Sequence, residues 1–304
     1  MISRYTHHGL SWIDLESPTK EEIVALADEH NLHPLIASEL YNPTERARVD
    51  IYENASYFIL HFPVRNRTTS LIEEVEVDFV LMENVLITTH YVLVDPLHDF
   101  AKLFEAQSLL SKSAPSAPRA GLLFFMAIRE LYKHTHYLLE GVAKDIRSIE
   151  NHIFAGEESA MVNRISRSNR VLIDIRQAMR YHKETLKSFE HSCKHFCSTD
   201  YQYYANSIEG EYEHIDRLLL ECRDTLRDLR ETNDSLLTTK TNAIIRKLTV
   251  VNIVLLPLGL VTWIFAMESQ FLSLDDPKAL IAVFAGMGII ALSSVLYFKS
   301  RKWL

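Results

Sequence analysis

The chain has 304 residues, of which 47% are hydrophobic and 24% charged, and its formal net charge is −8. This length allows one large soluble domain and a smaller second unit. Six of the 32 basic and three of the 40 acidic residues lie from Arg246 onward, so residues 1–245 carry a formal charge of −11. This acidic balance argues against a nucleic-acid partner and suits a protein that attracts cations.

The cysteines and the N-terminal residues indicate the cellular compartment in which the large domain lies. Cys193, Cys197 and Cys222 are an odd number, and the first ten residues contain no apolar run of signal-peptide length. We therefore expect no disulfide framework, a reducing compartment, and a large domain that stays on the side where it is synthesised.

Residues 1–118 have the pattern of an α/β domain. Trp12–Leu15 predicts a strand, and Ser17-Pro18-Thr19 supplies a cap and a proline ahead of the amphipathic stretch 21–30, which predicts a helix. Stretches rich in β-branched and aromatic residues predict further strands at 57–62, 75–81 and 85–89. A mixed sheet flanked by helices is expected.

Residues 119–200 contain few helix breakers and repeat apolar residues every three or four positions. This heptad spacing is typical of long helices packed side by side, and it comprises Leu138, Val142, Ile146, Ile149 and Ile153. Ala155–Glu158 predicts a turn, after which the stripe resumes with Val162, Ile165, Leu172, Met179, Leu186 and Phe189. The pattern predicts an antiparallel helical hairpin.

Residues 201–247 predict a stalk helix that leads into an apolar segment. Its apolar face comprises Ile215, Leu219, Cys222, Leu226, Leu229 and Leu236. No breaker lies between Gly210 and Pro257. A continuous helix from Gln202 to Met267 would be about 100 Å long at 1.5 Å per residue.

Two stretches without Asp, Glu, Lys or Arg, 248–267 and 279–298, each have the length that crosses a bilayer. Buried core helices are seldom free of charge on every face over five turns, so we predict two transmembrane helices. Basic residues before the first span and after the second place both termini in the cytoplasm, with 268–278 as the outer loop and 299–304 as a basic tail. A bacterial inner membrane is the expected location.

One helical face of the first span carries polar residues. Steps of three or four from Asn242 give Ile245, Thr249, Asn252, Leu256 and Gly259. An amide such as that of Asn252 has to face water or bury itself against protein inside a membrane. A hydrogen bond between packed helices is the alternative to a water-filled pathway.

No enzymatic motif is present. The sequence contains no phosphate-binding glycine loop, dinucleotide fingerprint or nucleophile elbow, so no catalytic residue is assigned. His191, Cys193, His195 and Cys197 have metal-ligand side chains, but on a helix the cysteines lie about 200° around from the histidines. We therefore predict no structural metal site there.

Taken together, this layout resembles the CorA family of pentameric divalent-cation channels over essentially the whole chain. The resemblance is carried by an α/β domain, a helical hairpin, a long helix entering the membrane and two spans joined by a short acidic loop. Local matches are Lys240-Thr241-Asn242, Leu256-Pro257-Leu258, Tyr297-Phe298-Lys299, Lys302-Trp303-Leu304 and, more weakly, Leu32–Leu35.

The resemblance implies a homopentamer whose first span lines a central pore. Asn242, Ile245, Leu248, Asn252, Leu256 and Gly259 would face the axis, in partial agreement with the polar stripe, which adds Thr249. Family members carry Gly-Met-Asn at the outer mouth, where the asparagines hold a hydrated magnesium ion, whereas this chain has Ala266-Met267-Glu268. Five Glu268 carboxylates in one ring would attract cations but bind them tightly.

Other acidic residues are candidates for cation binding. Asp275 and Asp276 either present an acidic outer surface or are solvated loop residues. The family senses magnesium through acidic side chains between cytoplasmic domains, and Glu209, Glu211, Glu213 and Asp216 are the candidates here. A solvated helix surface is the alternative interpretation.

We therefore expect a membrane cation channel, of magnesium type, whose partners are further copies of itself and the lipid bilayer. It would use no cofactor beyond a divalent cation that is transported or regulatory. The altered tripeptide leaves two alternatives open: a non-conducting scaffold or regulator that binds other membrane proteins, and zinc transport as in a related branch of the family.

Overall fold

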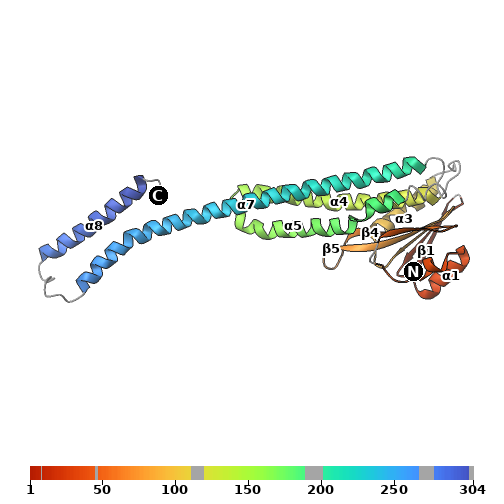
Figure 1. Ribbon diagram of the computed structural model, residues 1–304, viewed down its shortest axis with the longest axis horizontal. Helices are drawn as coiled ribbons and strands as arrows, with labels where there is room; N and C mark the ends of the chain where they lie inside the picture. Colours follow the sequence, from red (N-terminus) through yellow and green to blue (C-terminus); the bar gives the residue numbers. More distant parts are fainter. Residues whose placement is uncertain (8, 45–46, 111–119, 189–200, 267–276, 301–304) are drawn as a thin grey trace. The chain divides into compact units, whose positions relative to one another are not determined.

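The computed structural model describes the chain except for residues 8, 45–46, 111–119, 189–200, 267–276 and 301–304 (Figure 1). The chain divides into two compact units, Met1–Arg230 and Glu231–Leu304. One helix, α7 (Tyr201–Ala266), contributes residues to both.

A six-stranded mixed sheet organises the first unit. Its spatial order is β1-β2-β6-β5-β4-β3, with β2 and β6 parallel and the other neighbours antiparallel. The mixed sheet and the strands predicted at 12–15, 57–62, 75–81 and 85–89 are confirmed, whereas β1 and β3 were not predicted. The strands are β1 (Ile2–His7), β2 (Leu10–Glu16), β3 (Arg48–Ile51), β4 (Ser56–Arg65), β5 (Ile72–Leu81) and β6 (Val85–His90).

Helices α1 (Lys20–His30) and α2 (Pro34–Glu39) pack on one face of the sheet. Thr19 and Glu22 form a capping box at the start of α1, in which each side chain accepts a hydrogen bond from the other residue's backbone N–H. The predicted helix is therefore confirmed. The buried side chains of α1 and α2 pack with those of β2, β4 and β5 in one core. This core includes Ile23, Leu26, Ile36, Ile13, Leu15, Ile59 and Val80.

Helices α3 (Asp95–Leu110) and α4 (Ala120–Phe154) pack on the opposite face. Side chains alternate along a strand, so Trp12 and Phe58 point to this face while their neighbours Ile13 and Ile59 point to the other. The ring centroid of Trp12 lies 4.6 Å from that of Phe100 on α3, and that of Phe58 lies 5.0 Å from that of Phe124 on α4.

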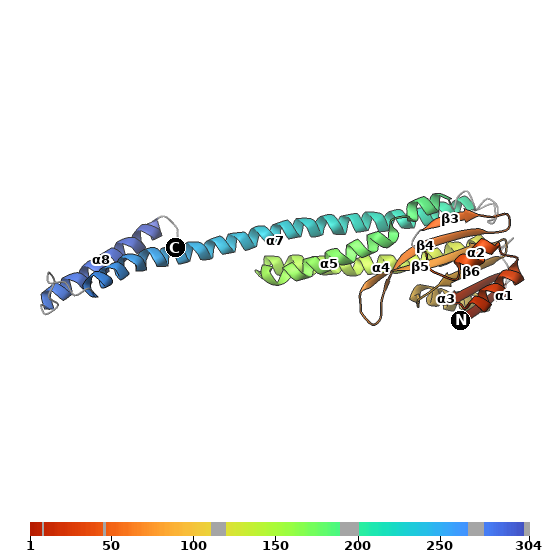
Figure 2. The same cartoon turned by 60° about the horizontal axis from the view of Figure 1, so that its bottom comes forward.

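Helices α4 and α5 (Glu158–Met179) form the predicted antiparallel hairpin (Figure 2). Gly156 lies in the turn with φ 93°, a backbone conformation that favours glycine. The predicted stripe of α4 is buried, but Val162 on α5 is 42% exposed and Met161 is buried in its place. Of the remaining stripe residues, Ile165, Leu172, Met179 and Leu186 are buried, and Phe189 lies outside the described residues.

The long helix α7 spans 66 residues, as predicted. In the first unit its predicted apolar face is buried at Ile215, Leu219, Cys222, Leu226 and Leu229. Leu236, the last residue predicted on that face, belongs to the second unit and is half-buried.

The second unit consists of the remainder of α7 and of α8 (Pro277–Ser300). Both helices are long and apolar enough to cross a membrane. Large apolar side chains on them are exposed, including Trp263 at 73% and Phe284 at 64%. These helices therefore need lipid or further protein around them, as the two predicted transmembrane helices would.

Candidate functional site

The predicted pore residues lie on one side of α7. Because each residue of a helix advances by about 100°, all seven fall within about a third of the helix circumference. They are Asn242, Ile245, Leu248, Thr249, Asn252, Leu256 and Gly259. Ile245, Leu248 and Leu256 are 54%, 59% and 64% exposed. A single chain therefore leaves this face uncovered.

Asn252 differs from the other polar residues of this segment. The hydroxyls of Thr249 and Thr262 donate to the carbonyls of Ile245 and Leu258 at 2.8 and 2.9 Å, so the helix itself satisfies them. The exposed amide of Asn252 has no hydrogen-bond partner among the residues that the structure describes. Inside a membrane this amide requires water, a hydrated ion or another protein chain.

Pro257 lies inside α7, five residues beyond Asn252. Proline has no N–H, so the carbonyl of Ile253 lacks its usual helical donor. At Gly259 an added Cβ would have no neighbour within 4 Å, so nothing within the single chain requires glycine there. The span thus exposes the Asn252 amide and leaves the Ile253 carbonyl without its usual helical donor, and amide and carbonyl oxygens can bind a cation or its hydration water.

The predicted outer mouth lies at and beyond the end of α7. Ala266 is the last residue of the helix. Met267 and Glu268, and Asp275 and Asp276 of the outer loop, lie outside the described residues.

The four predicted sensing residues do not come together on α7. Glu209, Glu213 and Asp216 are exposed on one face, beside the buried stripe that contains Ile208 and Ile215. Glu211 is half-buried and lies on the other side of that stripe, about 140–160° around the helix from the other three.

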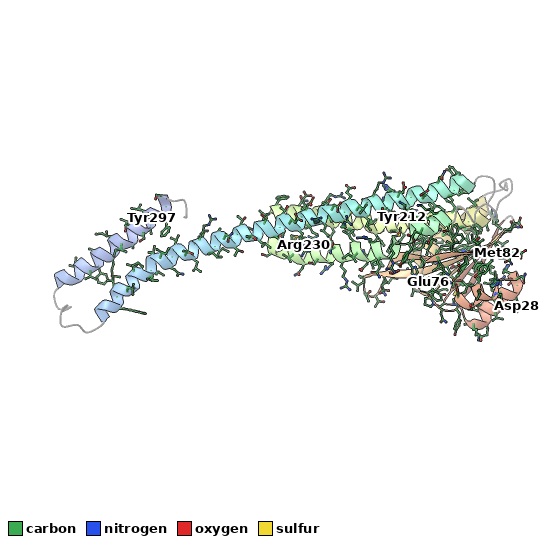
Figure 3. The ribbon with its side chains drawn as sticks, in the orientation of Figure 1. Asp28, Glu76, Met82, Tyr212, Arg230 and Tyr297 are labelled. Atoms are coloured by element: carbon green, nitrogen blue, oxygen red, sulfur yellow. The ribbon has the colours of Figure 1, made fainter. Side chains whose placement is uncertain are left out.

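A buried charged group in the sheet was not predicted. His61 on β4 faces Glu76 on β5, with Nε2 of His61 3.6 Å from Oε2 of Glu76 (Figure 3 labels Glu76). The backbone N–H of Thr44 donates to the same carboxylate oxygen at 2.5 Å. Burial alone would lower the pKa of His61, but the adjacent Glu76 carboxylate outweighs burial and raises it.

Asp78 lies two residues along β5 from Glu76, so both side chains point to the same face of the sheet. Asp78 is fully buried, and the Tyr91 hydroxyl donates to its Oδ2 at 3.2 Å. Burial, and after it the charge of Glu76, raises the pKa of Asp78 well above its usual range. Asp78 therefore binds a proton more readily than an exposed aspartate does.

An acidic pocket of about 670 Å³ opens beside this group, lined by Glu73, Glu74, Glu76, His61 and Arg180 among others. Among the described residues, no three or more His, Cys, Asp or Glu side chains are arranged to hold one metal ion. Within the buried group, Glu76 is thus paired with His61, and Asp78 accepts a hydrogen bond from Tyr91. Its sequence signal, acids alternating along a strand, does not reveal which residue each acid faces.

The chain matches one family along nearly its whole length. A profile of the CorA-like Mg2+ transporter protein family matches residues 7–300. The cobalt/magnesium transport protein CorA of Thermotoga maritima is 22% identical over 296 residues, which cover 97% of this chain and 83% of that protein.

Solved structures show the same fold. The complete CorA magnesium transporter from Methanocaldococcus jannaschii has a TM-score of 0.83 at 17% identity, over 99% of this chain and 93% of that one. The full-length CmaX protein has a TM-score of 0.73 at 15% identity, over 97% and 89% of the two chains. The similarity in fold thus extends over the sheet, the helical hairpin and both apolar helices.

Proposed function

The chain belongs to the CorA-like Mg2+ transporter family, and on this premise we propose that it conducts Mg²⁺ or a similar divalent cation along α7. The ion would move between helices α7 of a homopentamer, with Asn242, Thr249 and Asn252 facing its hydration shell. The protein is a transporter rather than an enzyme. The divalent cation is its substrate, and no cofactor is required.

The observation that carries this proposal is the unpartnered amide of Asn252. It lies on the same face as Asn242 and as three large exposed apolar side chains. Packing this face against copies of itself covers the exposed side chains and turns the amides toward a common axis. A hydrated cation on that axis supplies the hydrogen-bonding partners that the helix does not.

The orientation in the membrane follows from charge. Arg246 and Lys247 precede the first span and Lys299 follows the second, so we place both ends of the chain in the cytoplasm and the protein in the plasma membrane, the inner membrane of a bacterium. The acidic first unit would then raise the cation concentration at the inner end of the pathway. Glu209, Glu211, Glu213 and Asp216 are candidates for sensing the ion there.

The outer mouth would be formed by Ala266, Met267 and Glu268, with Asp275 and Asp276 in the loop beyond. Five Glu268 carboxylates attract cations more strongly than five amides do, and they repel one another. We therefore expect Glu268 to set which cations enter.

The test is ion flux into proteoliposomes that contain the purified chain, compared for Mg²⁺, Zn²⁺, Na⁺ and K⁺. Glu268→Ala and Glu268→Asn are measured beside the wild type, with Asp276→Asn as a control for a neighbouring carboxylate. We expect Mg²⁺ flux and an order of preference among the ions that changes with both Glu268 variants.

The other outcomes separate the alternatives. A preference for Zn²⁺ would redirect the proposal to zinc transport. Intact pentamers that pass none of the four ions would contradict it and indicate a non-conducting scaffold.

A further inference from the structure

His136 on α4 and His214 on α7 meet at the surface of the first unit. Their Nε2 atoms are 3.2 Å apart, their ring centroids are 5.1 Å apart, and the planes differ by 18°. The two rings are nearly parallel, and their Nε2 atoms lie within hydrogen-bonding distance of each other. Two nitrogen lone pairs that face each other repel, so a proton or a metal ion has to lie between them.

We propose that this pair binds a transition-metal ion such as Zn²⁺, Co²⁺, Ni²⁺ or Cu²⁺. Imidazole nitrogens bound to tetrahedral Zn²⁺ lie about 2.0–2.1 Å from the metal, which places two of them about 3.3 Å apart. The observed Nε2 separation of 3.2 Å accommodates such an ion with little movement of either helix.

The surroundings favour a cation between the rings. Oε1 of Glu140, one turn along α4, lies 3.9 Å from Nδ1 of His136. The negative charge of this carboxylate favours a cation bound at the pair. The side chain of His136 is 33% exposed and His214 is exposed, so an ion can enter from solvent and water can complete its coordination.

The ligand type separates this site from the proposed ion pathway. Mg²⁺ prefers oxygen ligands and retains much of its water, whereas imidazole suits Zn²⁺, Ni²⁺ and Cu²⁺. The site therefore distinguishes transition metals from Mg²⁺ and does not depend on conduction. A bound ion would link α4 to α7, the helix that carries Asn252 further along the chain.

The test is a calorimetric titration of Zn²⁺ into the purified full chain in detergent, with excess Mg²⁺ present to occupy oxygen sites. We expect His136→Ala and His214→Ala each to bind one Zn²⁺ per chain fewer than the wild type. His98→Ala, which removes an exposed histidine from α3, is the matched control and should bind as the wild type does. Because His136 and His214 both lie at the surface, circular dichroism should show that neither substitution changes the helix content.

A double substitution tests the two histidines of the 191–197 cluster. His191→Ala with His195→Ala should leave the His136–His214 ion in place. The electron paramagnetic resonance spectrum of bound Cu²⁺ should show coupling to two imidazole nitrogens in the wild type and the loss of one in each single variant. The proposal is overturned if the wild type binds no Zn²⁺, if neither His136→Ala nor His214→Ala changes binding, or if only the His191/His195 variant loses the ion.

Discussion

The hydroxyl of Tyr132 lies 2.8 Å from Nδ1 of His182, while Nε2 of His182 donates to the carbonyl of His61 at 2.7 Å. With its proton on Nε2, the neutral ring accepts the Tyr132 hydrogen bond at Nδ1. Both side chains are buried, and burial lowers the pKa of His182 to about 4. A neutral histidine therefore joins α4 and β4 to the segment that follows α5.

His182 should make the stability of the first unit depend on pH. Its pKa is about 4 in the folded protein, against about 6.5 in an unfolded chain, so the unfolded state binds more protons between these values. Stability is then undiminished above about pH 6.5 and falls by roughly 3 kcal/mol as the pH drops to 4. Thermal unfolding of the wild type and of His182→Gln from pH 7.5 to 4.5 measures this. The variant should lose less stability over this range, and an equal loss in both proteins would contradict the assignment.

Removing the Tyr132 hydroxyl tests the same contact at a pH where His182 is neutral in both states. Tyr132→Phe leaves Nδ1 of a buried ring without a donor, which costs about 1–3 kcal/mol. Tyr137→Phe, on the same helix at a side chain that is 68% exposed, is the matched control. At pH 7.5 the first variant should unfold at a lower temperature than the wild type and the second should not. Equal unfolding temperatures for the two variants would show that the contact contributes little.

The sequence predicts those elements whose signals are local. Thr19 and Glu22 predict the capping box of α1 because both partners lie within one turn, and the absence of breakers predicts the length of α7. Strand β1 carries polar and apolar residues with little regularity, and its side chains are exposed or only half-buried, so no pattern marks it. Helix α3 does have a signal, since Leu97, Phe100, Ala101 and Phe104 follow helical spacing and are all buried.

Contacts between residues that are far apart in the sequence could not be predicted from it. His61 and Glu76 face each other only because of the register of β4 with β5. His136 and His214 are 78 positions apart and meet only because α7 packs against α4. Helical periodicity alone predicts which residues of α7 share the pore face. Because α7 is one continuous helix, these residues do lie on one side of it. The single chain does not determine what packs on this face.

The His61–Glu76 pair should stabilise the first unit more at low pH than at high pH. Glu76 raises the pKa of His61 in the folded protein, so this contribution is fully present below the unfolded pKa and is lost as the pH rises through the folded value. Glu76→Gln should therefore destabilise the protein more at pH 6 than at pH 8, as measured by thermal unfolding. Glu74→Gln, an exposed neighbour on β5, should have little effect at either pH. A larger effect of Glu76→Gln at pH 8 than at pH 6 would contradict the pairing.

The central claim is that a cation passes Asn252 on the inner face of a ring of α7 helices. Hydrogen bonds to charged groups contribute about 1.5–3 kcal/mol. Loss of this amide should therefore slow the ion by about tenfold or more. Ser293→Leu on α8 is the matched control, because that hydroxyl already donates to the carbonyl of Ile290 at 3.0 Å.

The most direct measurement is Mg²⁺ uptake by proteoliposomes that contain equal amounts of wild type, Asn252→Leu or Ser293→Leu, each verified as an intact oligomer. The account predicts rapid uptake by the wild type and by Ser293→Leu, and uptake reduced about tenfold or more by Asn252→Leu. Equal uptake by all three proteins would show that the ion does not pass this face of α7, and no uptake by any of them would contradict conduction itself.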